Sequence, residues 1–388
     1  MALADPVQSF NLPSRWARNA AGIVFLLVLC AGLVSALWSV AVDRNEAAWT
    51  REGFMQGDVA RDLAGKLAGA AVPGALADAE RAVSWWVTGS LGPRVRQGCG
   101  QWLFLADELS VHAQGAQNAR QRLDALTRVH DYLQRRNIEL VVVTVPDKSR
   151  VQHGQLCNVY RPASLAGRLG EWEESLAQQG VRHVSLLAAL ETMAAEEGDS
   201  PFLRTDTHWS EAGARASAGL VAQAVHQAGV PPTPVQHYLV EKGPAQPRHG
   251  DLVRLAGLDW LPLSLQPRPD VVAPAVFTAQ ATSGEAPADD ADLFGDANLP
   301  NLALIGTSYS GTSSFAAYLA AALQTQLPSF AQDGGDFWGA AKTYLESKEF
   351  RDAPARLLIW EVPERVIQMP VSPEEQAWMD ALATSGGK

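Results

Sequence analysis

Apolar and polar residues follow two different periods along the central part of the chain. Over Arg120–Arg136, leucine and valine recur at every third or fourth position, which predicts an amphipathic helix with one apolar face. The next segment, Ile138–Val145, is a nearly continuous apolar run rich in β-branched residues, and it ends at Pro146. Such a run is typical of a strand buried on both faces of a parallel sheet. The pattern therefore indicates a helix that leads directly into a buried strand.

The same alternation continues towards the end of the chain. Further helices are predicted over Ser164–Gln179, Ser210–Ala228 and Ser313–Leu323, and further strands over Val181–Leu186, Asn301–Ile305 and Leu357–Val362. Ser210 has a side chain that suits a helix N-cap. Alternating strands and helices predict an α/β domain in which helices cover a mostly parallel sheet.

An uncharged apolar segment, Ala20–Val42, is long enough to cross a bilayer as a helix. Arg15 and Arg18 precede it and acidic residues follow it from Asp43, which favours an N-terminus in the cytoplasm. A cleaved signal peptide is one alternative, although its apolar core is usually shorter and a small-x-small cleavage site follows it. A buried core helix is another, although this run is apolar all round. We predict a cytoplasmic tail over residues 1–19 and a transmembrane anchor over 20–42.

Two segments beyond the anchor differ from the α/β pattern. Residues 43–95 mix alanine, charged and apolar residues at helical spacing, which predicts a helical stalk or cap. The α/β domain is then predicted over residues 96–388. Within it, residues 262–299 are rich in proline, alanine, aspartate and serine, and this composition predicts an irregular surface insertion.

Charge and composition exclude several functions. The formal net charge is -11 and no basic patch stands out, so we expect no binding to nucleic acid. An acidic protein also suits a strongly anionic polymer poorly unless it has a local basic groove. No Cys-x-x-Cys or His-Glu-x-x-His spacing occurs, so neither a metal site nor a cofactor is predicted.

The chain contains three cysteines. Cys30 lies inside the apolar segment, whereas Cys99 and Cys157 lie in the remainder. Two cysteines in an oxidising compartment can form a disulfide. Buried free thiols are the alternative, because cysteine is often buried as a small apolar residue.

A serine follows one of the predicted buried strands. In Gly306-Thr307-Ser308-Tyr309-Ser310 the strand is expected to turn tightly into a helix, with Gly306 relieving steric crowding. Ser308 would then lie at the carboxyl end of a strand, where open α/β sheets bind their ligands. Backbone N–H groups at the start of the helix are candidates for stabilising an oxyanion. The alternative is a serine-rich loop that caps a helix, and the Gly-x-Ser-x-Gly elbow is absent.

An acid and a base stand two residues apart in Asp206-Thr207-His208-Trp209. In extended backbone, such residues face the same way, so Asp206 can orient the His208 imidazole and stabilise its protonated form. Trp209 is expected to wall the site, exclude water and stack on a sugar. An aspartate that caps the following helix beside a surface histidine is the alternative. His249, with Asp251 two residues on, is the rival base.

These two motifs resemble the signature blocks of the alginate O-acetyltransferase family of the AlgJ/AlgX type. The matching blocks are Thr205–Ala214 and Leu304–Ser310. Further similar segments follow the order of the family from about residue 96 to 366: Gln101–Phe104, Val145–Lys148, Gly250–Leu252 and Trp360–Arg365. The resemblance implies a three-layer SGNH-hydrolase-like domain in which the order of the motifs is circularly permuted, because Asp206 and His208 precede Ser308.

The resemblance also implies roles for individual residues. Ser308 is the expected nucleophile, His208 the general base and acid, and Asp206 its orienting partner. The candidates for oxyanion stabilisation or substrate binding are Gly306, Tyr309, Trp209, Arg365 and Lys148. For Arg365 and Lys148 we favour structural salt bridging.

The function that these features imply is a single-pass protein of the bacterial inner membrane whose periplasmic domain acetylates an exported polysaccharide. A membrane-bound O-acyltransferase would supply the acetyl group, and a polysaccharide synthase or export complex, as in biofilm formation, would supply the acceptor. A neutral glucan such as cellulose and alginate are both candidate acceptors. The alternatives are an acetylesterase that uses the same triad and a non-catalytic scaffold of an export complex.

Overall fold

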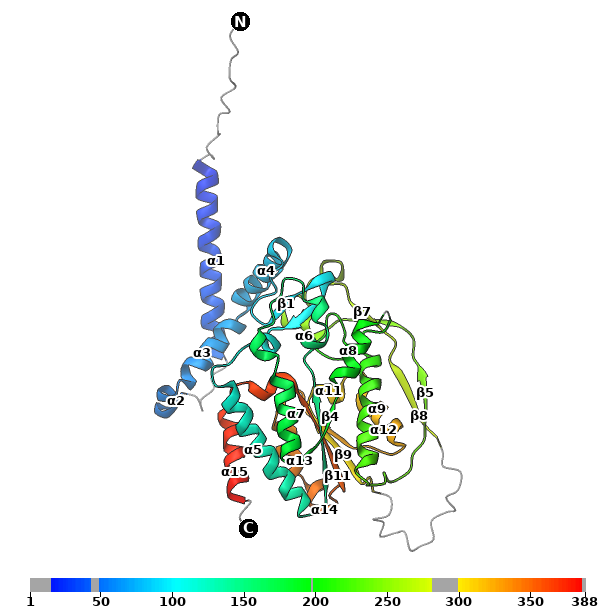
Figure 1. Cartoon of the computed structure of the whole chain (residues 1–388). Helices are drawn as coiled ribbons and strands as arrows, with labels where there is room; N and C mark the ends of the chain where they lie inside the picture. Colours follow the sequence, from blue (N-terminus) through cyan, green and yellow to red (C-terminus); the bar gives the residue numbers. More distant parts are fainter. Residues whose placement is uncertain (1–14, 43–48, 197, 281–298, 386–388) are drawn as a thin grey trace. The chain divides into compact units, whose positions relative to one another are not determined.

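The computed structural model describes residues 15–42, 49–196, 198–280 and 299–385. The chain divides into two compact units, one ending at Thr88 and the other beginning at Gly89 (Figure 1). The predicted boundary at residue 95 differs from this division, because α4 already ends at Thr88 and Gly89 follows it with a positive φ of 71°. Each unit is described separately below.

The first unit is helical. Its helices are α1 (Arg15–Val42), α2 (Arg51–Gln56), α3 (Asp58–Gly69) and α4 (Ala71–Thr88). Within the described residues, one helical segment, Asn19–Val42, is long and apolar enough to cross a membrane. Most of the large apolar side chains of this helix are exposed. Residues 1–14 of the predicted tail and residues 43–48 of the predicted stalk lie outside the described part of the chain, whereas the last tail residues, 15–19, already belong to α1.

The second unit is built on a five-stranded parallel sheet with the strand order β10-β9-β11-β3-β4. Its strands are β3 (Glu139–Val145), β4 (Arg182–Ser185), β9 (Leu302–Gly306), β10 (Ser329–Ala331) and β11 (Leu357–Pro363). Four of them fall on the predicted apolar runs. The exception is β10, a short edge strand of three residues whose exposed and half-buried side chains give no pattern to recognise.

Helices cover both faces of this sheet, as the predicted α/β class requires (Figure 1). Leu140 and Val142 of β3 pack into one apolar core with α5, α7, α13 and α15, whereas Val141 and Val143 pack into a second core with α8, α9 and α12. The covering helices are α5 (Gly115–Gln134), α7 (Arg168–Gln178), α8 (Leu187–Ala195), α9 (Glu211–Gln227), α12 (Phe315–Leu323), α13 (Gly339–Leu345) and α15 (Pro373–Ser385). Burial on both faces explains the apolar run at the centre of β3, from Leu140 to Val143.

The second unit also contains shorter helices and strands outside the five-stranded sheet. The helices are α6 (Lys148–Val151), α10 (Asp251–Leu255), α11 (Ser308–Gly311) and α14 (Lys348–Asp352). The strands β1 (Val95–Gln97), β2 (Leu103–Leu105), β5 (Tyr238–Lys242), β6 (Gln246–Arg248), β7 (Asp270–Val272) and β8 (Ala275–Ala279) form antiparallel pairs β1–β2, β5–β8 and β6–β7.

The predicted irregular insertion over residues 262–299 is therefore wrong in part. Its first half contains β7 and β8, which find their partners in β6 and β5 from earlier in the sequence. These strands pair with segments far away in the sequence, and proline and alanine in and around them obscure the alternating pattern that would predict a strand. The remainder of the insertion, residues 281–298, lies outside the described residues.

A disulfide joins Cys99 to Cys157, whose Cα atoms lie 5.4 Å apart. The sequence left this pairing open against two free thiols. The bond closes a loop across 58 positions of the sequence and ties the segment before β2 to the segment after α6. A cross-link of this span lowers the entropy of the unfolded chain, which stabilises the fold by about 4 kcal/mol.

A buried ion pair fixes the last helix to the sheet domain. Arg122 of α5 donates from Nε and Nη2 to the two carboxylate oxygens of Glu375, at 2.8 and 2.7 Å. Its Nη1 donates to the carbonyl oxygens of Ile367 and Met369. Both charged side chains are buried, so every donor of the guanidinium needs a partner within the protein.

We expect Glu375→Ala to lower the free energy of unfolding by about 3 kcal/mol, because it leaves Arg122 buried without its counter-charge. Urea unfolding of the full chain, followed by tryptophan fluorescence, measures the change. Glu374→Ala is the matched control, since Glu374 lies in the same turn and is exposed; its effect should stay within about 0.5 kcal/mol. Equal effects of the two variants would show that the ion pair contributes nothing specific.

Candidate active site

Ser308 begins a single helical turn at the carboxyl end of β9. Thr307 caps this turn, α11, by accepting a hydrogen bond from the backbone N–H of Tyr309. Gly306 ends the strand, and a Cβ there would lie 2.5 Å from Ser310 Oγ and 2.6 Å from a carboxylate oxygen of Glu361. The absence of a side chain at Gly306 therefore allows the turn to pack closely against Glu361. The side chain of Ser308 is partly exposed.

Glu361 holds this turn from the neighbouring strand β11. Its Oε2 accepts hydrogen bonds from the Thr307 backbone N–H at 2.7 Å and from Ser310 Oγ at 3.0 Å, and Thr307 Oγ1 also donates to it. Glu361 is fully buried, and burial raises the pKa of its carboxyl although these hydrogen bonds oppose the rise. The sequence pattern did not predict this role for Glu361. A lone glutamate within an otherwise apolar strand was the available signal.

The His208 imidazole connects the acid to the serine. Its Nδ1 lies 2.7 Å from Asp206 Oδ1, and its Nε2 lies 2.7 Å from Ser308 Oγ. Asp206 Oδ1 also accepts the backbone N–H of His208 at 3.0 Å. The structure therefore brings together the three residues that the sequence motifs singled out, from segments one hundred positions apart.

The charge on Asp206 determines which way these hydrogen bonds run. Burial alone would raise the pKa of its carboxyl, but hydrogen bonds and charge from His208, together with Arg248, hold this pKa far below its ordinary value. Arg248 Nη2, at the end of β6, lies 3.2 Å from Asp206 Oδ2. An ionised Asp206 accepts the proton of Nδ1, which leaves the lone pair of Nε2 free to accept the proton of Ser308.

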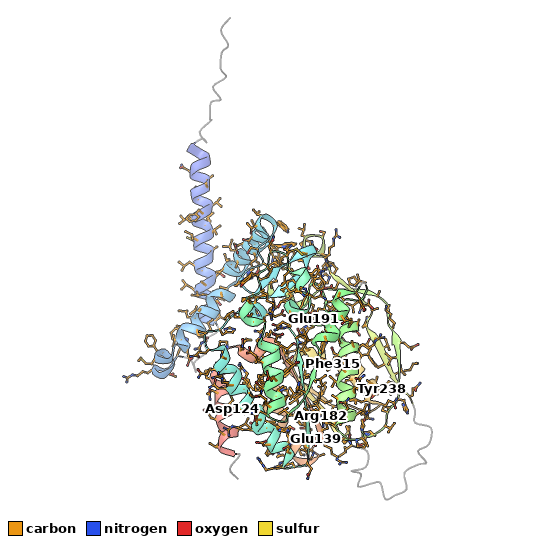
Figure 2. The ribbon with its side chains drawn as sticks, in the orientation of Figure 1. Asp124, Glu139, Arg182, Glu191, Tyr238 and Phe315 are labelled. Atoms are coloured by element: carbon orange, nitrogen blue, oxygen red, sulfur yellow. A yellow bond between two sulfur atoms is a disulfide. The ribbon has the colours of Figure 1, made fainter. Side chains whose placement is uncertain are left out.

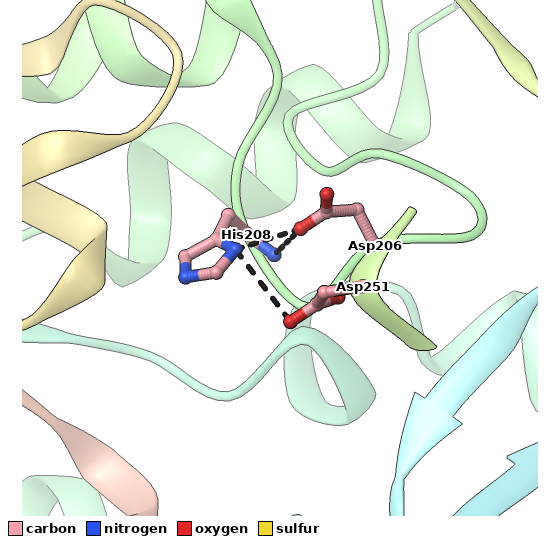
Figure 3. A group of neighbouring side chains, drawn as sticks. All are labelled: Asp206, His208 and Asp251. Carbon is pink, nitrogen blue, oxygen red and sulfur yellow. Dashed lines mark hydrogen bonds and ion pairs between the residues drawn. The ribbon is translucent and has the colours of Figure 1, made fainter. Parts of the chain in front are cut away.

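Asp251 is a second carboxylate beside this pair (Figure 3). Its Oδ1 accepts the Thr207 backbone N–H at 2.7 Å, and its Oδ2 lies 3.9 Å from His208 Nδ1. Burial and the charge of Asp206 raise the pKa of Asp251. The rival base His249 is exposed, so the acidic neighbour that drew attention to it belongs instead to the site of His208.

Asp206, His208 and Asp251 also bring donor atoms of metal-ligating types within 4.8 Å of one another. Each of these groups already has a hydrogen-bonding role: Nδ1 with Asp206, and the two carboxylates with backbone N–H groups. This bonding favours acid–base chemistry for the group.

Lys148 is hydrogen-bonded to the backbone of the segment that carries Asp206. Its Nζ donates to the carbonyl oxygens of Leu103, Arg204 and Asp206, at 2.6, 3.0 and 2.9 Å. The ammonium also lies 5.1 Å from the ring centre of Trp102. Burial lowers the pKa of Lys148 to about 8, although nearby carboxylates oppose the shift. The sequence favoured a structural salt bridge for Lys148, whereas its ammonium donates to three backbone carbonyl oxygens.

Two predicted substrate residues lie in the core instead. Trp209 is fully buried, with its ring 4.6 Å from that of Phe315, which is labelled in Figure 2. The prediction that Trp209 stacks on a sugar is therefore wrong, because the motif alone does not reveal which neighbours cover the ring. Tyr309 is also buried, and its hydroxyl donates to the Thr207 carbonyl oxygen at 2.9 Å. Both residues connect the segment of His208 to the segment of Ser308.

Two further predictions concern Arg365 and the backbone amides of the turn that carries Ser308. The Arg365 guanidinium lies 5.6 Å from the ring centre of Tyr309, the residue that follows Ser308. The helix N-terminus was expected to offer free N–H groups for an oxyanion. However, the amides of Thr307 and Tyr309 already donate to Glu361 and to Thr307 Oγ1, so these two are engaged.

Comparison with known proteins places this geometry in context. Residues 95–364 match the model of the SGNH hydrolase-like domain of the acetyltransferase AlgX. The chain is 35% identical over 310 residues to the probable alginate O-acetylase AlgJ of Azotobacter vinelandii, covering 79% of this chain and 78% of that protein. The solved O-acetyltransferase domain of Pseudomonas putida AlgJ superposes with a TM-score of 0.63 at 29% identity, covering 76% of this chain and 99% of that domain. Pseudomonas aeruginosa AlgX superposes with a TM-score of 0.52 at 25% identity, covering 74% and 67%.

We expect Glu361→Ala to lower kcat/KM about 100-fold, because the freed Thr307 amide lets the serine turn shift away from His208. Glu361→Gln is the matched variant: its amide oxygen keeps the N–H acceptor, so activity should stay within about fivefold of wild type. Turnover of a chromogenic acetyl ester measures both, with circular dichroism to verify folding. A folded Glu361→Ala protein of full activity would contradict the assignment.

Proposed function

The chain belongs to the AlgX family of SGNH hydrolase-like acetyltransferases, and on this premise we propose that it transfers acetyl groups to hydroxyls of an exported polysaccharide. The observation that supports this proposal most directly is the continuous hydrogen-bonded series from Asp206 through His208 to Ser308, at 2.7 Å in each step. Such a series activates a serine hydroxyl for acyl transfer.

In the first half of the proposed reaction, Ser308 Oγ attacks the carbonyl carbon of an acetyl donor. The serine proton passes to His208 Nε2, which is already within hydrogen-bonding distance. The bond between the acetyl carbon and the leaving group then breaks, and the leaving group takes the proton from His208. An acetyl ester of Ser308 remains. Asp206 stabilises the imidazolium that forms between these steps.

In the second half, a sugar hydroxyl replaces the leaving group. Its oxygen attacks the acetyl carbon while its proton passes to His208, and the Ser308 oxygen then leaves with that proton. The product is an acetylated sugar and the free enzyme. Water in place of the sugar would give an esterase. The relatives named O-acetylase favour a sugar hydroxyl as the acceptor.

The location and partners of the reaction form part of the proposal. The apolar helix Asn19–Val42 would anchor the chain in the inner membrane, with residues from Gly89 onward in the periplasm. Acetyl-CoA does not reach that compartment, so a membrane-bound O-acyltransferase would pass the acetyl group across. An alginate-type exopolysaccharide is the acceptor suggested by the relatives, and a neutral glucan is the acceptor suggested by the net charge of -11.

We expect intact-protein mass spectrometry to detect one added acetyl group after the full chain, in detergent, meets an activated acetyl ester. Peptide mapping should place it on Ser308, and Ser308→Ala should abolish it, because no other hydroxyl is bonded to His208 Nε2 among the described residues. Ser329→Ala is the matched control, since Ser329 is exposed at the start of β10.

Added oligosaccharides then separate transfer from hydrolysis. Transfer adds acetyl groups to mannuronate oligomers or cello-oligosaccharides and depends on Ser308. Release of acetate without any acetylated sugar would assign the protein as an esterase. Absence of acetyl-Ser308 together with absence of product would reject enzymatic acetyl transfer altogether.

A further inference from the structure

The segment from Arg248 to Asp251 places two opposite charges beside the Asp206–His208 pair. Arg248 contacts the outer oxygen of Asp206 at 3.2 Å, and Asp251 faces His208 Nδ1 at 3.9 Å. We propose that Arg248 and Asp251 are paired positioning residues that set the pH range in which His208 serves as the base. This inference rests on the proposed triad chemistry and adds two residues outside the triad.

The backbone of this segment can approach the catalytic loop because residue 250 is glycine. A Cβ at Gly250 would overlap the carbonyl oxygen and carbon of Thr205. The contact brings the end of β6 and the start of α10 against the loop on both sides of Asp206. A single loop therefore delivers both charges, and its position is fixed by backbone packing as well as by the ion pair.

The carboxylate of Asp251 has two separate contacts. Oδ1 accepts the backbone N–H of Thr207 at 2.7 Å, which fixes the loop between Asp206 and His208. Oδ2 faces the imidazole. The first contact requires an acceptor, whereas the second acts through charge, so an amide in place of the carboxylate separates the two effects.

Other charged groups face the pair from several elements. Lys148 of α6 donates to the Asp206 carbonyl oxygen, and Asp270 of β7 accepts the Arg204 and Thr205 backbone N–H groups. The ring of Tyr309, from α11, lies 4.9 Å from the imidazole ring. These groups remain unchanged when Arg248 or Asp251 is substituted, so they shift every variant equally.

The two charges act on the base in opposite directions. A carboxylate near an imidazole favours the protonated ring, and a guanidinium near its acid partner disfavours it. Because the neutral ring is the active form, loss of the Asp251 charge should extend activity to lower pH. Loss of the Arg248 charge should withdraw activity to higher pH. The Arg248 effect should be smaller, because its side chain is 31% exposed and solvent screens it.

The test is the pH profile of kcat/KM for an acetyl ester with the full chain and three variants. Asp251→Asn should move the acid limb down by about one pH unit. Arg248→Gln should move it up by about half a unit. The double variant should return towards wild type, because the two charge changes cancel. Asp259→Asn is the control: it removes the same charge from an exposed side chain after α10, where solvent screens it, so its acid limb should stay in place.

The outcomes distinguish this inference from the proposed function. Variants that lose activity at every pH, with unmoved limbs, would assign purely structural roles and overturn the inference. A double variant shifted as far as Asp251→Asn alone would also overturn it. Mass spectrometry of acetyl-Ser308 in each variant verifies that the triad still reacts, and its absence from wild type would reject the proposed function instead.

Discussion

The hydrogen bond from Ser308 Oγ to His208 Nε2 is the contact on which the rest of the site depends. It joins a turn after β9 to a loop before α9. Because the two segments are one hundred positions apart in the sequence, the backbone between them does not fix their relative position. A displacement of about 1 Å between them would weaken proton transfer about 100-fold. The surrounding structure must therefore fix two separate backbones relative to one sheet.

Two buried ionisable side chains each hold one of these backbones. Glu361 holds the serine turn through backbone and hydroxyl donors, and Lys148 holds the acid loop through three carbonyl acceptors. Burying either group without such partners would cost several kcal/mol, so each is stable only when its segment adopts this geometry. Tyr309 completes the connection, because its hydroxyl bonds to Thr207 across the two segments. The hydrogen bonds of these three buried side chains therefore determine the relative position of Ser308 and His208.

The sequence predicted the parts of this arrangement that leave a local pattern. The apolar runs of β3, β9 and β11 identified the centre of the sheet, and the spacing in Asp206-Thr207-His208 singled out two side chains that the structure brings within hydrogen-bonding distance. Burial was harder to predict, because a tryptophan beside a catalytic histidine has the same local context whether it faces substrate or core. From the sequence, Asp251 was considered only as the acidic neighbour of His249. Its proximity to His208 could not be predicted, because it depends on the packing of Gly250 against Thr205.

The disulfide between Cys99 and Cys157 links this geometry to the environment of the chain. It braces the two segments that flank Leu103 and Lys148, the residues joined under the acid loop. Disulfides persist in oxidising compartments and are reduced in the cytoplasm. Under the proposed periplasmic location, this brace would form only after export. The loop that carries Asp206 would then reach its full rigidity in the compartment proposed for the reaction.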